Sequence, residues 1–142
     1  MMKTMLKYND LQEGQQLETM TKPAITKVQI VKYAGTSGDF NPLHTDDAFA
    51  QKVGMDGVIA HGMLVMGFLG QYVRELADTE ADIEKFNMRF GDMTKPGDEI
   101  TCTGIVAALY EQDGKKYADL DLKAEKAPEK VVGSGKAVLC FR

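Results

Sequence analysis

The residues whose types and spacing could do chemistry lie in the stretch YAGTSGDFNPLHTDD, residues 33–47. It contains His44, one of only two histidines in the chain, and Asp39 precedes this histidine by five positions. An imidazole exchanges protons near neutral pH, and a carboxylate beside it can take part in the transfer or orient the same water molecule. Asp39 and His44 are therefore candidate catalytic residues for acid–base chemistry on water.

The same residue types also have an ordinary structural use. Asp and Asn side chains stabilise turns by accepting hydrogen bonds from nearby backbone N–H groups, and a loop histidine can serve as a cap. Gly38 permits unusual backbone angles, and Pro42 disfavours the helical region for Asn41 before it. We therefore expect an ordered loop here, and both a structural and a catalytic use of its polar residues remain open.

A second segment, IAHGM at residues 59–63, adds a candidate site for negative charge. The pattern that follows predicts a helix, whose first N–H groups lack partners within the helix and whose dipole is positive at this end. Gly62 would lie at this start, where the absence of a side chain leaves its N–H open to a carbonyl oxygen. Gly62 is therefore a candidate oxyanion donor. His61 is more simply interpreted as a helix-start residue that faces solvent or packs in the core.

Metal and cofactor chemistry have little support. The oxygen and imidazole groups that could bind a divalent ion belong to Asp39, His44, Asp46 and His61. Their spacing matches no zinc or EF-hand pattern, so we expect no metal. The chain also lacks the motifs of phosphate loops, dinucleotide sites and serine hydrolases, and we expect no cofactor.

Composition narrows the classes of partner. The chain has 142 residues, 44% of them hydrophobic and 27% charged, and no apolar run approaches the ~18 residues that cross a bilayer. Its net charge of −4 argues against a nucleic-acid partner. No secretory signal is visible, so a cytoplasmic location is expected. Cys102 and Cys140 lie in strand-like runs without a metal or redox motif, and we expect buried, reduced thiols.

The elements that must position these residues follow from hydrophobic periodicity. A strand-like stretch is expected at residues 16–21. Apolar residues at a helical period then predict a helix that begins after Thr26 and ends at Gly35. A short helix is expected from its cap at Thr45 to Lys52.

The longest predicted helix covers residues 60–77 and is apolar on nearly every side in its first half, which indicates a buried helix. Glycines at positions 62, 67 and 70 weaken it, so we expect close approach of another backbone to compensate. Four strand-like runs follow, at residues 83–90, 99–110, 115–125 and 130–141. Asp113 and Gly114 predict a hairpin between two of them. Helices followed by antiparallel strands indicate an α+β protein.

Together, the motifs YAGTSGDFNPLH and IAHGM resemble the signature of the MaoC-like (R)-specific enoyl-CoA hydratases and 3-hydroxyacyl-thioester dehydratases, which have the hot-dog fold. The resemblance covers most of the chain, through the segments MRF and KPGD. It implies a single domain over residues 1–142, with an antiparallel sheet wrapped around a long central buried helix. The short helix GMLVMGFLG is most similar to those of small bacterial dehydratase subunits.

The resemblance implies roles for individual residues. Asp39 and His44 would form the catalytic pair, and Asn41 would support the loop beside the substrate. Gly62 would donate its N–H to the thioester carbonyl. Some family hydratases carry a serine about two turns along the helix that helps orient the catalytic carboxylate. Without a gap in the alignment this position is Gly70 here, so that hydrogen bond would be absent.

The implied substrate is an acyl-CoA or acyl-carrier-protein thioester, hydrated reversibly across its C2–C3 double bond. The implied assembly is a dimer, either of two copies or with a related subunit, in which the partner helps enclose an acyl tunnel. Met63 and Met66 are candidate substrate-binding residues in that tunnel, although methionines on such a helix commonly belong to the core. Arg89 is one of several cations that could meet a phosphate of the carrier.

Two other functions on this fold remain open. A non-catalytic or partner-dependent subunit of a heterodimeric dehydratase would bind acyl thioesters while its partner carries out the chemistry. The joint presence of Asp39, Asn41 and His44 argues against it. A thioesterase of this fold usually relies on a carboxylate of the central helix, and no acid occurs between Ala60 and Arg74.

Overall fold

The computed structural model describes residues 6–127 and 129–142. Its helices are α1 (Lys27–Ser37), α2 (Asp47–Lys52) and α3 (Gly62–Ala77), with short 3-10 turns η1 (Tyr8–Asp10) and η2 (Pro42–His44). Its strands are β1 (Met20–Thr21), β2 (Ala81–Phe90), β3 (Thr101–Gln112), β4 (Lys115–Ala127) and β5 (Lys130–Phe141). In the described ranges no helix has the length and apolar character needed to cross a membrane.

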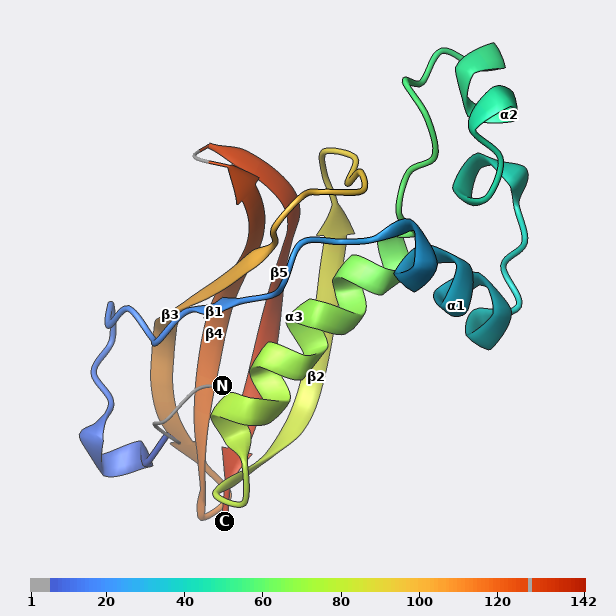
Figure 1. Ribbon diagram of the computed structural model, residues 1–142. Helices are drawn as coiled ribbons and strands as arrows, with labels where there is room; N and C mark the ends of the chain where they lie inside the picture. Colours follow the sequence, from blue (N-terminus) through green and yellow to red (C-terminus); the bar gives the residue numbers. More distant parts are fainter. Residues whose placement is uncertain (1–5, 128) are drawn as a thin grey trace.

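The strands form one antiparallel sheet in the order β1-β3-β4-β5-β2. As predicted, β3 and β4 form a hairpin at Asp113 and Gly114, whose φ angles of 55° and 78° suit a type I′ turn. β2 pairs with β5, and its other edge has no strand partner within the described chain. The sheet curls around α3 (Figure 1). This confirms the α+β class and the helix-in-sheet arrangement that the hot-dog resemblance implies.

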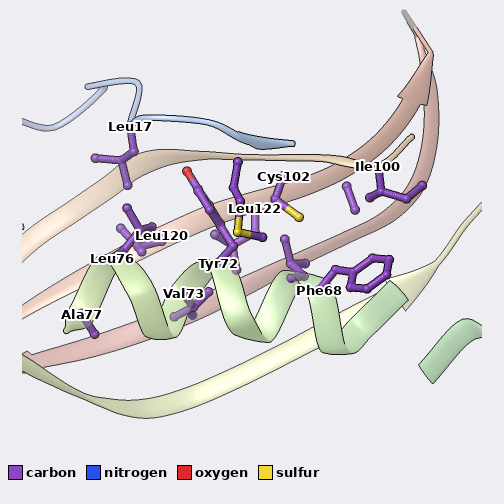
Figure 2. Packing of buried hydrophobic residues seen from close by; sticks show 14 of the residues in the cluster. Leu17, Phe68, Tyr72, Val73, Leu76, Ala77, Ile100, Cys102, Leu120 and Leu122 are labelled. Carbon is purple, nitrogen blue, oxygen red and sulfur yellow. The ribbon is translucent and has the colours of Figure 1, made fainter. Parts of the chain in front are cut away.

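The core lies between α3 and the concave side of the sheet. Figure 2 shows Tyr72, Val73 and Leu76 of α3 packed together with Leu120 and Leu122 of β4. All five are buried, at a helical spacing on α3 and at every second position on β4. These contacts hold the C-terminal half of α3 against β4.

Both cysteines are free and buried, as the sequence predicts. Burial raises the pKa of the Cys102 thiol to about 12, because the thiolate would lose its hydration. We expect Cys102, in a Cys140→Ser variant, to resist a thiol-reactive disulfide reagent at pH 8 until urea unfolds the chain. The stability contributed by this neutral thiol is fully present below the unfolded pKa, about 8.5, and is lost as the pH rises toward 12. Rapid labelling of the folded protein would contradict this burial.

The start of α3 differs from the prediction. The helix begins at Gly62 rather than Ala60, and His61 is its N-cap in an extended conformation. One side of the first half of the helix is open in the single chain: Met63 is 54% exposed, whereas Leu64, Val65, Phe68 and Leu69 are buried. The sheet covers only one side of α3, and this end of the helix points toward α1 and away from the sheet (Figure 1). An apolar helix surface therefore remains open next to the loop that carries Asp39.

The glycines of α3 are not approached by another backbone, contrary to expectation. A Cβ at Gly62 would lie 3.0 Å from the ring of Phe90, and one at Gly70 would lie 3.6 Å from the ring of Phe86. At Gly67 an added Cβ would meet no atom within 4 Å. Side chains of β2, rather than backbone, therefore occupy the space beside the first and third of these glycines.

α1 begins as predicted but ends later. The Thr26 side chain accepts a hydrogen bond from the Gln29 N–H at 3.0 Å. The helix continues through Gly35 to Ser37, and Gly38 ends it as the C-cap with a φ of 74°. The predicted stop at Gly35 is wrong because only Gly38 adopts the left-handed conformation that closes a helix. The loop that follows therefore begins directly at Asp39.

Replacing Gly35 or Gly38 with alanine is expected to change the free energy of unfolding in opposite directions. In Gly35→Ala the new Cβ has open space on a helical backbone, so the free energy of unfolding should rise by about 0.5–1 kcal/mol. In Gly38→Ala the side chain must hold a positive φ, so the free energy of unfolding should fall by about 1–2 kcal/mol. Urea unfolding of the two matched variants measures the difference. Equal stabilities would contradict the assignment of Gly38 as the helix cap.

α2 is capped one residue later than predicted. The Asp46 side chain accepts hydrogen bonds from two backbone N–H groups of α2, whereas Thr45 closes the preceding turn η2. The next acid, Asp47, accepts hydrogen bonds from Lys27 of α1 and from the Val58 N–H, and these bonds lower the pKa of its carboxyl. Asp47 thereby ties α1 and α2 to the segment that leads into α3.

Candidate active site

The segment between α1 and α2 carries Asp39 and His44 on a loop that Asn41 organises. The Asn41 Oδ1 accepts a hydrogen bond from the Leu43 N–H at 3.0 Å, and the Asn41 N–H lies 3.3 Å from Asp39 Oδ1. The His44 N–H donates to the Asn41 carbonyl at 3.0 Å. Asn41 and the Oδ1 atom of Asp39 thus stabilise the turn, as the structural interpretation of these residues expects. Asp39 Oδ2 and the His44 ring lie outside these bonds.

A backbone carbonyl fixes the ring of His44. Its Nδ1 lies 2.8 Å from the Ile59 oxygen, so in the neutral ring Nδ1 carries the hydrogen and Nε2 carries the lone pair. Nε2 lies 4.0 Å from Asp39 Oδ2, with 12% of the His44 side chain and 52% of the Asp39 side chain exposed. The gap is too long for a direct hydrogen bond, but one water molecule can contact both atoms.

His61 packs directly against this pair and is 2% exposed. Its ring stacks on the ring of His44, with centroids 3.8 Å apart and an interplanar angle of 23°. Its Nε2 lies 3.1 Å from the backbone oxygen of Asp39. The ring of Tyr33, from α1, contacts it edge to face at 4.9 Å. Sequence reasoning gave His61 no catalytic part, and it did not single out Tyr33 or Ile59, because only the folded chain brings these residues to His44.

Gly62 follows His61 as the first residue of α3, so its N–H lies at the positive end of the helix dipole. The ring of Phe90, at the end of β2, lies beside it and is 55% exposed. Met63 is exposed at the next position, and Met66, one turn further along, is half-buried. The structure thus brings the oxyanion candidate and the two candidate substrate-binding methionines to one end of the helix.

The geometry of the cluster shows whether it could bind a metal ion. Ligand atoms of Asp39, His44 and His61 lie within 4.8 Å of one another, so a divalent ion is worth considering. A histidine nitrogen, however, binds a metal in the plane of its ring. Two nearly parallel rings stacked at 3.8 Å cannot both direct a lone pair at one ion without rotating. Asp46, the fourth candidate, caps α2 instead. The cluster suits a water molecule better than a metal.

Two other candidates from the sequence lie away from the His44 ring. Gly70, on α3, faces the ring of Phe86 on β2. Arg89 lines a groove of about 710 Å³ on the sheet, together with Lys123 and Lys136. None of Asp39, His44 or Gly62 lines this groove, so its cations do not belong to the cluster around His44.

Known proteins resemble the chain over most of its length. The MaoC like domain family matches residues 9–126. The chain is 31% identical to an (R)-specific enoyl-CoA hydratase of Rhodospirillum rubrum, covering 93% of this chain and 89% of that protein. It is 33% identical to an (R)-specific enoyl-CoA hydratase of Aeromonas caviae, covering 69% of this chain and 77% of that protein.

The fold also resembles the folds of solved structures. An (R)-hydratase structure from Aeromonas caviae superposes with a TM-score of 0.81 at 27% identity, covering 94% of this chain and 98% of that one. The chain also matches segments of much longer fungal fatty acid synthase beta subunits. It spans only 3% of the one from Cochliobolus carbonum and 5% of the one from Emericella nidulans.

Proposed function

The chain belongs to the MaoC-like domain family, and from this premise we propose that it is a hydro-lyase acting on enoyl thioesters. The reaction is the (R)-specific hydration of a trans-2-enoyl thioester of CoA or acyl carrier protein to the 3-hydroxyacyl thioester, and the reverse dehydration. The observation that carries the proposal is the 4.0 Å gap between His44 Nε2 and Asp39 Oδ2, which one water molecule can bridge. Two (R)-specific hydratases among the relatives support the same chemistry.

In the hydration direction, the bridging water is the nucleophile. The lone pair of His44 Nε2 removes one of its protons while the water oxygen forms a bond to C3. Asp39 Oδ2 accepts a hydrogen bond from the other proton and orients the oxygen. The Ile59 carbonyl, which accepts the Nδ1–H of His44, stabilises the charge that the ring carries during the transfer.

The electrons of the double bond move toward C2 and the thioester carbonyl, whose oxygen becomes negative. The Gly62 N–H, at the positive end of α3, donates a hydrogen bond to this oxygen. The His44–Asp39 pair then returns the proton to C2 from the same face. One water molecule is thus added with no net change in protons, and dehydration runs through the same steps in reverse.

Exposed apolar side chains around Gly62 suit the acyl chain. Met63, next to Gly62 in the chain, and Phe90, whose ring lies beside Gly62, are both exposed, and the half-buried Met66 follows on α3. Several large apolar side chains exposed together mark a binding surface more often than ordinary protein surface. We assign Met63 and Met66 to contact with the acyl chain. Asn41 supports the reaction from behind the site by holding the loop.

A second subunit would enclose this open surface. β2 has an edge without a strand partner in the described chain, and Ile83 and Phe90 of this strand are exposed. Proteins usually cover or block such strand edges, because an open edge invites pairing with another chain. We propose a dimer, of two copies or with a related subunit, in which the partner completes the wall of the acyl site.

The experiment that tests the proposed function mixes the purified chain with crotonyl-CoA and follows loss of the conjugated enoyl-thioester absorbance. The configuration of the 3-hydroxyacyl product is then determined. Formation of the (R) product supports the proposal. An (S) product contradicts it, as does the absence of reaction with short and long acyl chains on both CoA and acyl carrier protein.

A partner-dependent subunit is the alternative, and the openness of the site favours it. Asp39 and Phe90 are each more than half exposed in the single chain, so nothing within the described residues closes the site on that side. An inactive chain that gains hydratase activity when a related MaoC-like subunit is added would support this alternative. Light scattering on the chain alone shows whether it already forms a dimer.

A further inference from the structure

We propose that His61 is a positioning residue for this reaction, which holds the Asp39 backbone and the His44 ring in their reactive arrangement. The inference rests on the proposed function, because it assigns a part in that chemistry to a side chain outside the His44–Asp39 pair. It concerns a residue whose position in the sequence indicates only the start of a helix.

The contacts of His61 join the two halves of the catalytic pair. Its Nε2 lies 3.1 Å from the Asp39 carbonyl, and because a carbonyl oxygen can only accept, Nε2 carries the hydrogen. Its ring face lies 3.8 Å from the ring of His44. The two stacked histidines therefore hold opposite tautomers, Nε2–H at His61 and Nδ1–H at His44, and a backbone carbonyl dictates each.

The helix start does not need a histidine. Ser, Thr, Asp and Asn are the favoured N-cap residues because their side chains bond the first free N–H groups of a helix. His61 is the N-cap of α3 and makes no side-chain cap hydrogen bond. Its side chain is directed at the loop instead of at its own helix, so the choice of residue is not explained by capping.

The core does not need a histidine here either. His61 Nδ1 is buried and has no hydrogen-bond partner within the described residues. A buried nitrogen without a partner destabilises the folded state. Phenylalanine has a ring of similar size and no such nitrogen, so it would fill the same space without that cost. The polar ring is retained at a cost in stability, as expected of a residue that serves a site.

The stacked ring also acts on the reaction itself. His44 becomes positively charged when it takes a proton from the water, and an aromatic face beside a cation is favourable. This contact gains strength only as the charge develops, so it stabilises the transition state more than the bound substrate. Loss of His61 should therefore lower kcat more than it raises KM.

The test compares variants that separate the two contacts. His61→Phe keeps a ring face and removes the N–H donor, and His61→Asn keeps a donor and a good N-cap but removes the ring. With crotonyl-CoA as substrate, each is expected to lower kcat roughly 10- to 100-fold with KM within about twofold. The Tm of His61→Phe should stay near that of the wild-type protein, because removal of the unpartnered Nδ1 offsets loss of the hydrogen bond to the Asp39 carbonyl. Val73→Ala, a cavity in the core away from the site, is the control: it should lower Tm and leave kcat unchanged.

An unchanged kcat in His61→Phe overturns the proposal. So does a loss of kcat in Val73→Ala as large as that in His61→Phe, because a general loss of stability would then account for both. Nitrogen-15 NMR of the wild-type protein adds a readout that needs no variant to fold. The chain has only two histidines, so their signals are readily distinguished. At a pH where both rings are neutral, the opposed tautomers support the proposal, and an Nδ1–H tautomer at His61 in an active enzyme overturns it alone. A chain with these tautomers that hydrates none of the thioesters overturns the proposed function instead, and the positioning role with it.

Discussion

Replacing Asp39 with asparagine is expected to reduce the hydration rate by about 10²- to 10⁴-fold while leaving the fold intact. The side chain is half exposed, and its bond to the Asn41 N–H survives because an amide oxygen can accept it. An amide nitrogen in place of Oδ2, however, donates where the bridging water needs an acceptor. His44→Ala should cause a loss of similar size by removing the Nε2 lone pair. Initial rates with crotonyl-CoA, normalised to folded protein by circular dichroism, measure both effects.

Asp46→Asn provides a matched control for the first of these variants. It makes the same chemical change on the same loop, at a residue whose side chain caps α2. Asparagine is as good an N-cap as aspartate, so both stability and hydration rate should remain near those of the wild-type protein. A near-normal rate for Asp39→Asn would remove this residue from the catalytic pair.

Gly62→Pro is expected to reduce the rate by about 10²- to 10³-fold by removing a single hydrogen-bond donor. Proline is well tolerated at the first position of a helix, where its missing N–H has no partner within the helix. The preceding residue, His61, already has φ −62° and ψ 136°, the extended conformation that a following proline favours. The substitution therefore deletes the proposed oxyanion donor with little change to α3.

Gly62→Ala separates the donor from the bulk that proline adds. Its Cβ would lie 3.0 Å from the exposed ring of Phe90, which can move away, and its N–H is retained. Alanine should therefore lose much less activity than proline, and both variants should unfold at similar temperatures. Equal activities in the two variants would show that crowding, rather than the N–H, limits the reaction.

Local patterns were sufficient to predict much of the sheet and the ends of several elements. Alternating apolar residues and the Asp113–Gly114 pair predicted β3, β4 and their hairpin, because strand periodicity and turn geometry depend on neighbours in sequence. The Thr26 cap was predicted for the same reason. The end of α1 was not, since Gly35 and Gly38 carry the same local signal and only the folded backbone shows which has a positive φ.

The site was predictable only in part. The residue types of Asp39 and His44, five positions apart, identified a candidate pair, and the structure brings them within 4.0 Å. The contact of His61 with His44 could not be predicted, because it depends on how α3 approaches a loop 17 positions earlier in the chain. The openness of the helix start was missed because the apolar pattern of α3 does not distinguish a sheet of the same chain from a second subunit.

The site is divided between two parts of the molecule. The segment with α1 and α2, which projects beyond the end of the sheet (Figure 1), carries Asp39 and His44. Gly62 is the first residue of α3, and His61 is its N-cap. The polar contacts between the two parts include two carbonyl–imidazole hydrogen bonds and the bond from the Val58 N–H to Asp47. Subglobal opening of the projecting segment would separate the proposed catalytic pair from Gly62 while the sheet stays folded. We therefore expect urea to abolish the proposed hydratase activity at concentrations that leave the β-sheet circular dichroism unchanged, and amides of residues 38–46 to exchange with deuterium sooner than those of β4.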